Sequence, residues 1–165
     1  AGRPDGPRHG WAPDPRDRLT AALPELAGQV AATLRGEPGG RVLVLGTEEL
    51  MFVPMRLADV LARTPGRSVA YQSTTRSPVY PVDVDGYAIR AALTFPSPDD
   101  PQRVSHVYNV RPGLYDHIVV VVDAALDGTG PAEDGAVTGP MAAELARCAP
   151  VTVVSLPSFL PGGAR

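Results

Sequence analysis

The feature that most constrains the fold is the apolar run His117-Ile118-Val119-Val120-Val121-Val122-Asp123. A short, unbroken run of β-branched residues is typical of a strand that is buried on both faces, as in a parallel sheet. A second run of this kind, Arg41-Val42-Leu43-Val44-Leu45-Gly46, lies earlier in the chain between glycines. We therefore expect both runs to be strands of a mostly parallel sheet, with residues 41–46 at its centre.

Helical patterns separate these strands. Apolar residues at spacings of three and four predict a helix over residues 19–34, with Pro24 near its start, and a second helix from Leu50 onward. Pro54 fits the first turn of the second helix, where no amide donor is lost. A third helix is expected near residues 140–147.

The remaining strand patterns complete an α/β fold. Residues 68–72 and 151–154 are expected to be further strands. Apolar and polar residues alternate over 88–95 and 104–110, on both sides of a proline-rich turn, which predicts an antiparallel ribbon. The fold class expected is α/β, an open, mostly parallel sheet with flanking helices and a small antiparallel ribbon.

The chain has room for a single domain. Its 165 residues exceed what one sizeable core needs and fall short of two ordinary domains. Residues 1–18 are rich in proline, glycine and charge and are expected to be a flexible linker, residues 19–156 the domain, and residues 157–165 a frayed tail. Because the sequence begins at Ala1 without methionine, we expect it to be a piece of a longer protein.

Charge and hydropathy exclude several partners. The formal net charge is −3 and the sequence pI is about 5.5, so no basic surface for nucleic acid is expected. No apolar run has the length of a membrane span, and the N-terminus lacks the apolar core of a signal peptide. We expect a cytoplasmic protein that binds neither nucleic acid nor membranes.

The basic and metal-ligating residues narrow the chemistry further. All 15 basic residues are arginine, which excludes mechanisms that depend on a phosphate-binding or Schiff-base lysine. Cys148 is the only cysteine and is expected to be a buried thiol. His9, His106 and His117 are scattered, so neither a metal site nor a cofactor is predicted.

One polar segment is a candidate for binding an anion. The strand at 68–72 runs into Ser73, Thr74, Thr75, Arg76 and Ser77. An arginine grips phosphate or carboxylate through two parallel hydrogen bonds, and nearby hydroxyls and amides add donors. Ligands of open α/β sheets lie outside the carboxyl ends of the strands, where this segment is expected.

A second strand end carries acids. Thr47, Glu48 and Glu49 follow the strand at 41–46, and one carboxylate would hold a ribose hydroxyl, orient Arg76 or act as a base. The alternative is structural. In that case the acids cap the following helix, the hydroxyls satisfy local backbone groups, and Arg76 forms an ion pair with Glu48 or Glu49.

These two strand ends resemble a known family. Thr75-Arg76-Ser77-Pro78, after a strand and together with Gly46-Thr47-Glu48-Glu49 on an earlier strand end, is similar to the bacterial TRSP domain family, and the resemblance covers the chain from about Leu19 onward. Members lie C-terminal to a phosphoribosyltransferase domain. The resemblance implies such an upstream partner domain and a phosphorylated or nucleotide-like metabolite held through Arg76 and its neighbours.

The order of elements is also similar to the type I phosphoribosyltransferase fold. In those enzymes, paired acids and a threonine-glycine loop after an apolar strand bind the ribose and 5′-phosphate of the donor. Asp123 matches the first acid, but Ala124 replaces the second and residues 127–130 lack the threonine-rich run. The resemblance therefore implies a lost donor site, and Asp123 is either a ribose ligand or a structural cap of the loop.

Three functions remain open from the sequence. The first is a ligand-binding domain that accompanies a phosphoribosyltransferase in a ribosyl-compound biosynthetic pathway. The second is an independent enzyme on a ribosyl or phosphate compound, with Glu48 or Glu49 as base and Asp123 as second carboxylate. The third is a structural module for dimerisation. We further expect Glu48, Arg76 and Asp123 to converge on one cleft.

Overall fold

The computed structural model describes residues 13–35, 39–98, 100–123 and 139–156. Strands β2, β1, β5 and β6 form, in that order, a sheet in which all neighbours are parallel, while β3 and β4 form a separate antiparallel pair. The predicted α/β fold is thus confirmed. The elements along the chain are α1 (Pro13–Thr33), β1 (Arg41–Gly46), α2 (Phe52–Ala62), β2 (Ser68–Ser73), β3 (Ala92–Pro96), β4 (Val104–Tyr108), β5 (His117–Asp123), α3 (Pro140–Ala146) and β6 (Val151–Leu156).

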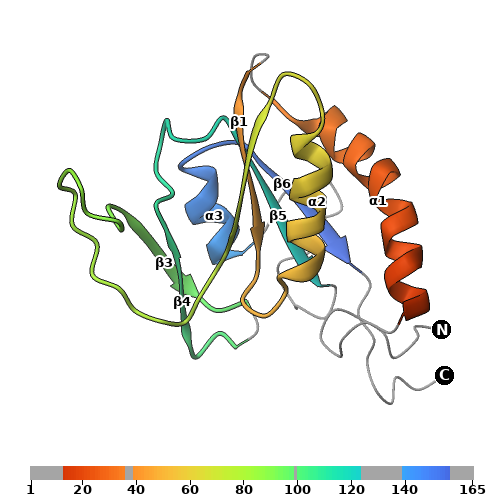
Figure 1. Cartoon of the computed structure of the whole chain (residues 1–165). Helices are drawn as coiled ribbons and strands as arrows, with labels where there is room; N and C mark the ends of the chain where they lie inside the picture. Colours follow the sequence, from red (N-terminus) through yellow and green to blue (C-terminus); the bar gives the residue numbers. More distant parts are fainter. Residues whose placement is uncertain (1–12, 36–38, 99, 124–138, 157–165) are drawn as a thin grey trace.

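The parallel sheet is covered on both faces, which is why its central strands are apolar without interruption. Helices α1 and α2 cover one face, and α3 with the β3–β4 ribbon covers the other (Figure 1). In β1, Val42 and Val44 join the core under α1 and α2, whereas Leu43 and Leu45 join the core on the opposite side. Successive side chains of a strand point to opposite faces, so a strand between two cores must be apolar at every position.

Helix α1 begins at Pro13 rather than at Leu19 and contains Pro24 in its interior. The prolines at 13 and 15 fall in its first turn, where amide groups lack intrahelical partners, so they favour this start. The earlier part of the predicted linker lies outside the described residues, as do residues 124–138 and the predicted tail at 157–165. None of the described helices combines the length and apolarity of a membrane span.

The antiparallel ribbon is shorter than its alternating pattern predicted. Asn109 adopts a positive φ of 53°, and its side-chain oxygen accepts a hydrogen bond from the Arg90 amide at 2.8 Å. This side chain replaces a backbone carbonyl of the facing strand as the hydrogen-bond acceptor, so the regular pairing stops and β4 ends at Tyr108 and β3 begins at Ala92. The antiparallel pairing itself is confirmed.

A long connection, residues 74–91, joins β2 to β3, and its part over residues 76–91 is here called the arm. It runs away from the parallel sheet on the side of the ribbon (Figure 1). Arg90 holds it in shape through ion pairs with Asp83 at 2.7 Å and Asp85 at 2.9 Å. Apolar side chains of the arm face solvent, with Tyr80 82% exposed and Val84 53% exposed.

Candidate functional site

A tight turn directly follows β1. The Leu50 amide donates to the Thr47 carbonyl at 2.8 Å, and Glu48 within this turn has a positive φ of 45°. Gly46 must lack a side chain, because a Cβ there would overlap the Leu50 carbonyl and lie 2.9 Å from Pro54 Cγ. Glycine at the strand end thus lets the chain fold back closely onto the start of α2.

The turn corrects one part of the sequence analysis. Glu48 and Glu49 do not cap a helix, because α2 begins at Phe52 with Met51 at its N-cap and has no acidic residue in its first turn. Their carboxylates are therefore placed by the turn and not by the helix terminus. A left-handed conformation at a residue other than glycine carries strain and is more frequent at functional sites.

Glu48 is bound on every side. Its amide donates to Thr74 Oγ1 at 2.9 Å, and its carbonyl accepts from Ser73 Oγ at 2.8 Å. Ser97 Oγ donates to one carboxylate oxygen at 2.6 Å, and Arg76 Nε lies 3.2 Å from the other. The side chain is only 5% exposed. Glu48 thus joins the ends of three strands, β1, β2 and β3.

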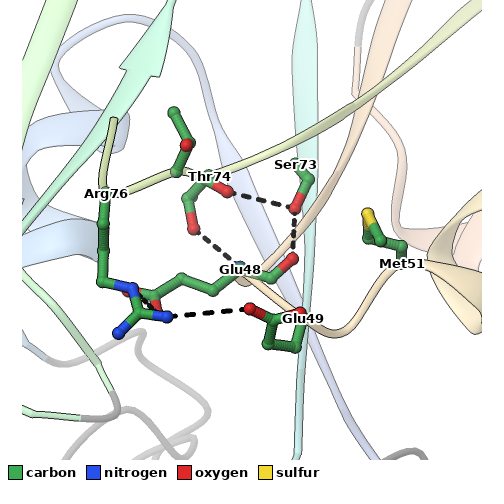
Figure 2. Close-up of a pocket in the computed structure, with 7 residues that line it drawn as sticks. Glu48, Glu49, Met51, Ser73, Thr74 and Arg76 are labelled. Carbon is green, nitrogen blue, oxygen red and sulfur yellow. Dashed lines mark hydrogen bonds and ion pairs between the residues drawn. The ribbon is translucent and has the colours of Figure 1, made fainter. Parts of the chain in front are cut away.

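Arg76 forms the ion pairs that the sequence analysis gave as the structural alternative. Besides Glu48 it contacts Glu49, with 3.6 Å between Arg76 Nη2 and Glu49 Oε1. Figure 2 shows the guanidinium next to the Glu48 carboxylate, with a dashed line to Glu49. The Arg76 side chain is 44% exposed and Glu49 is 77% exposed, so the second pair is solvated and weak. A guanidinium has five N–H donors, so part of its capacity stays available.

A pocket of about 290 Å³ opens between the ends of β1 and β2 (Figure 2). It contains four of the six predicted ligand-binding residues, whereas Thr47 and Ser77 do not line it. The residues that line it are Glu48, Glu49, Met51, Ser73, Thr74, Thr75 and Arg76.

The hydroxyl groups of the site are partly committed to the backbone. Thr75 Oγ1 accepts from the Ser77 amide at 3.1 Å, and the Thr75 backbone pairs with His106 of β4. The Tyr108 hydroxyl fixes the next stretch, donating to the Ser77 carbonyl and accepting from the Val79 amide, both at 2.7 Å. The segment that carries Arg76 is therefore anchored on the ribbon.

The sequence analysis expects Asp123 to share one cleft with Glu48 and Arg76. The structure describes only the backbone of Asp123. Gly46 is in register with Ser73 on one side and with Val121 on the other. Asp123 ends β5, the strand beside β1, so its backbone lies at the same edge of the sheet as Glu48. Its side chain, Ala124 and residues 127–130 lie outside the described residues. Its role in the site stays a prediction.

Two residues of the site carry no signal in the sequence. Ser97 is buried and binds Glu48, yet it stands in a proline-rich turn that reads as an ordinary connection. Met51 lines the pocket from the residue before α2. Within the described part of the chain, no group of three or more His, Cys, Asp or Glu side chains is placed to hold a metal ion.

Comparison with known proteins agrees with the motif at this site. A family model described as "TRSP domain C terminus to PRTase_2" matches residues 5–133. The match covers both strand ends of the pocket and most of the 165-residue chain. No curated protein matches the chain.

Proposed function

Because the chain belongs to the TRSP domain family, which is described as C-terminal to a phosphoribosyltransferase domain, we propose that it is the ligand-binding domain accompanying such a transferase. The ligand is a phosphorylated or nucleotide-like metabolite of a ribosyl-compound pathway. It occupies the pocket between the ends of β1 and β2. The observation that carries this proposal is the placement of Arg76, held by the buried Glu48 and still 44% exposed at the pocket.

The chemistry of the lining fits a ribosyl phosphate. The unused N–H groups of Arg76 are donors for phosphate oxygens, and the hydroxyls of Thr74 and Thr75 are further donors beside it. The exposed carboxylate of Glu49 is an acceptor for ribose hydroxyls. A volume of about 290 Å³ is just below the usual range for ligand pockets, roughly 300 to 1,000 Å³. It suits a single phosphoribosyl-sized group.

The two acids of the pocket oppose the binding of an anion. The side chains of Glu48, Glu49 and Arg76 carry a formal net charge of −1, since two carboxylates face one guanidinium. Glu49 therefore competes with a phosphate for Arg76. An exposed ion pair contributes only about 0–1 kcal/mol, so a phosphate that makes two charge-assisted hydrogen bonds competes with it successfully.

The geometry supports binding over catalysis by Glu48. Its side chain is only 5% exposed, and its two carboxylate oxygens already have partners in Ser97 and Arg76, so it is poorly accessible to a substrate proton. Glu49 is left as the only exposed acid among the residues lining this pocket. In this proposal the chemical step belongs to the transferase domain.

Isothermal titration calorimetry of the 165-residue chain tests the proposal. Ribose 5-phosphate, phosphoribosyl pyrophosphate and nucleoside monophosphates are titrated into the parent, Arg76→Ala and Arg63→Ala. Arg63 is the matched control, because it is an exposed arginine with an ion pair to Asp59 at 2.9 Å on α2. We expect Arg76→Ala alone to abolish binding. Affinities unchanged by Arg76→Ala would remove the ligand site.

The second candidate is the structural module, which the arm favours. The backbone that presents its exposed apolar side chains is held in place, since the Tyr87 hydroxyl donates to the Tyr80 carbonyl at 3.4 Å and the Tyr87 amide to the Val84 carbonyl at 3.2 Å. Tyrosines are enriched among the residues that dominate binding at protein interfaces. Sedimentation of the parent and of Tyr80→Ser decides between a dimer formed through the arm and a monomer.

A further inference from the structure

A second cavity lies at the opposite edge of the parallel sheet. It has a volume of about 510 Å³ and lies between the end of α1 and the amino-terminal ends of β5 and β6. Ligands of open α/β sheets usually bind at the other edge, so topology alone would not point here. Its lining residues are Ala32, Thr33, Leu34, Arg35, His117, Pro150, Val151 and Thr152.

Hydrogen bonds on the wall of this cavity have a fixed direction. Thr33 Oγ1 donates to the Val30 carbonyl at 2.8 Å, so toward Thr152 Oγ1, 3.0 Å away, it is an acceptor. The Thr152 hydroxyl therefore donates to Thr33 and accepts from His117 Nε2 at 2.9 Å. His117 Nδ1 in turn accepts from the Arg35 amide at 3.0 Å.

These bonds require a neutral imidazole. The proton sits on Nε2 of His117, because Nδ1 is needed as an acceptor. The side chain is buried, and burial together with the charges of Arg67 and Arg35 lowers its pKa. The imidazole of His117 is therefore neutral. The positive charge at the cavity comes from Arg35, which lines it, and from Arg67 beside the Arg35 backbone.

The two arginines differ from Arg76 in having no carboxylate partner. Within the described residues neither Arg35 nor Arg67 forms an ion pair, and Arg67 Nη1 is placed beside the Arg35 carbonyl at 3.5 Å. The nearby acid of this edge, Asp116, is already engaged, since its carboxylate accepts from the Arg41 amide at 2.7 Å. The described side chains thus leave two positive charges uncompensated next to a polar cavity.

We infer that this cavity is a second ligand site and binds the oxyanion group, phosphate or carboxylate, of a small molecule at Arg35, which lines the cavity, with the neighbouring Arg67 as a second positive charge. Unpaired guanidinium groups are the side chains best suited to hold such groups, through paired N–H donors. Thr33 and Thr152 line the same space and accept hydrogen bonds from hydroxyl groups elsewhere on the ligand. The competing explanation is that both arginines only offset the partial negative charge at the end of α1.

An NMR titration at constant ionic strength separates the two explanations. Inorganic phosphate and succinate are added in turn to the ¹⁵N-labelled 165-residue chain and to the double variant Arg35→Gln/Arg67→Gln. Arg63→Gln is the control for general loss of positive charge, and Arg76→Ala is the control for the other pocket. Phosphate and succinate identify which of the two oxyanions binds more tightly.

We expect saturable shifts of the amides of Thr33, Arg35 and Thr152 with at least one of the two anions. Affinity should fall at least 10-fold in the double variant, by loss of two charged contacts, and stay unchanged in both controls. The inference is overturned if neither anion gives saturable shifts at these amides in the parent. It is also overturned if Arg63→Gln weakens binding as much as the double variant. Binding that survives in Arg76→Ala separates this site from the proposed function.

Discussion

Ser97 donates a hydrogen bond of 2.6 Å to the carboxylate of Glu48, although the two residues are 49 positions apart in the sequence. This bond joins the end of β3 to the turn after β1 and fixes the Glu48 carboxylate. The same carboxylate forms an ion pair with Arg76 and so orients its guanidinium. The orientation of the one arginine in the pocket therefore depends on a buried acid and on a serine of the antiparallel ribbon.

The two glutamates of the turn should contribute very differently to stability. Glu48→Ala removes a buried hydrogen-bonded carboxylate and should lower the free energy of unfolding by about 1–3 kcal/mol. Glu49→Ala removes an exposed pair and should change it by less than about 0.5 kcal/mol. Alanine also carries a Cβ, so neither substitution relieves the backbone strain at the positive φ of position 48. Urea denaturation measures both values, and equal losses would contradict the described contacts.

Gly46→Ala should be severely destabilising. Its Cβ would overlap the Leu50 carbonyl, a backbone group, so the turn would have to move, at a cost of about 1–3 kcal/mol or more. Gly28→Ala is the matched control, since nothing lies within 4 Å of the added Cβ on α1. It should raise stability by about 0.5–1 kcal/mol. Thermal unfolding of both variants checks this contrast, and a stable Gly46→Ala protein would show that the turn is not tight.

Removal of the hydroxyl group should affect stability differently at Tyr71 and at Tyr108. The Tyr71 hydroxyl is buried with no partner among the described residues, and burial raises its pKa. Tyr71→Phe should therefore leave stability unchanged or raise it by about 1 kcal/mol. Tyr108→Phe leaves the Ser77 carbonyl and the Val79 amide without their partner and should cost about 1–3 kcal/mol. Chemical denaturation of both variants measures the difference, and a loss in Tyr71→Phe would reveal a partner for that hydroxyl.

His117 should make the protein less stable in mild acid. Its folded-state pKa is lowered, chiefly by burial, so the unfolded chain takes up a proton at a higher pH than the folded chain. The contribution of this histidine is complete above its ordinary pKa of about 6.5 and declines as the pH falls below that value. Unfolding measured between pH 7.5 and 5.5 should show a smaller decline in His117→Asn than in the parent. An identical decline would mean that other groups cause it.

The sequence predicts the parallel sheet well because its signal is strong and local. The runs that became β1 and β5 are apolar at every position, and a strand with a helix layer on each face requires that pattern. The sequence predicts a start of this helix at Leu19, because residues 13–18 have no apolar stripe. Prolines at a helix start do not produce one, so periodicity could not find this boundary.

The site was predictable only in part. Topology brings the ends of β1 and β2 together, so the neighbourhood of Glu48 and Arg76 followed from two adjacent strands. The positive φ of Glu48 and its contact with Ser97 could not be predicted from the sequence, because both depend on tertiary packing across the ribbon. A sequence cannot show whether an arginine pairs with acids or with a ligand when both lie within its reach.

The measurement that tests the central claim most directly follows the Nε–H signal of Arg76 by NMR while ribose 5-phosphate is added to the ¹⁵N-labelled chain. The account predicts a saturable shift of this signal together with the amides of Ser73, Thr74 and Thr75, and tighter binding in Glu49→Gln, which removes the competing carboxylate. The amides around Gly28 on α1 should not move. Shifts that leave Arg76 unchanged, or no saturable shift with ribose 5-phosphate, would contradict the claim that this pocket binds a ribosyl phosphate.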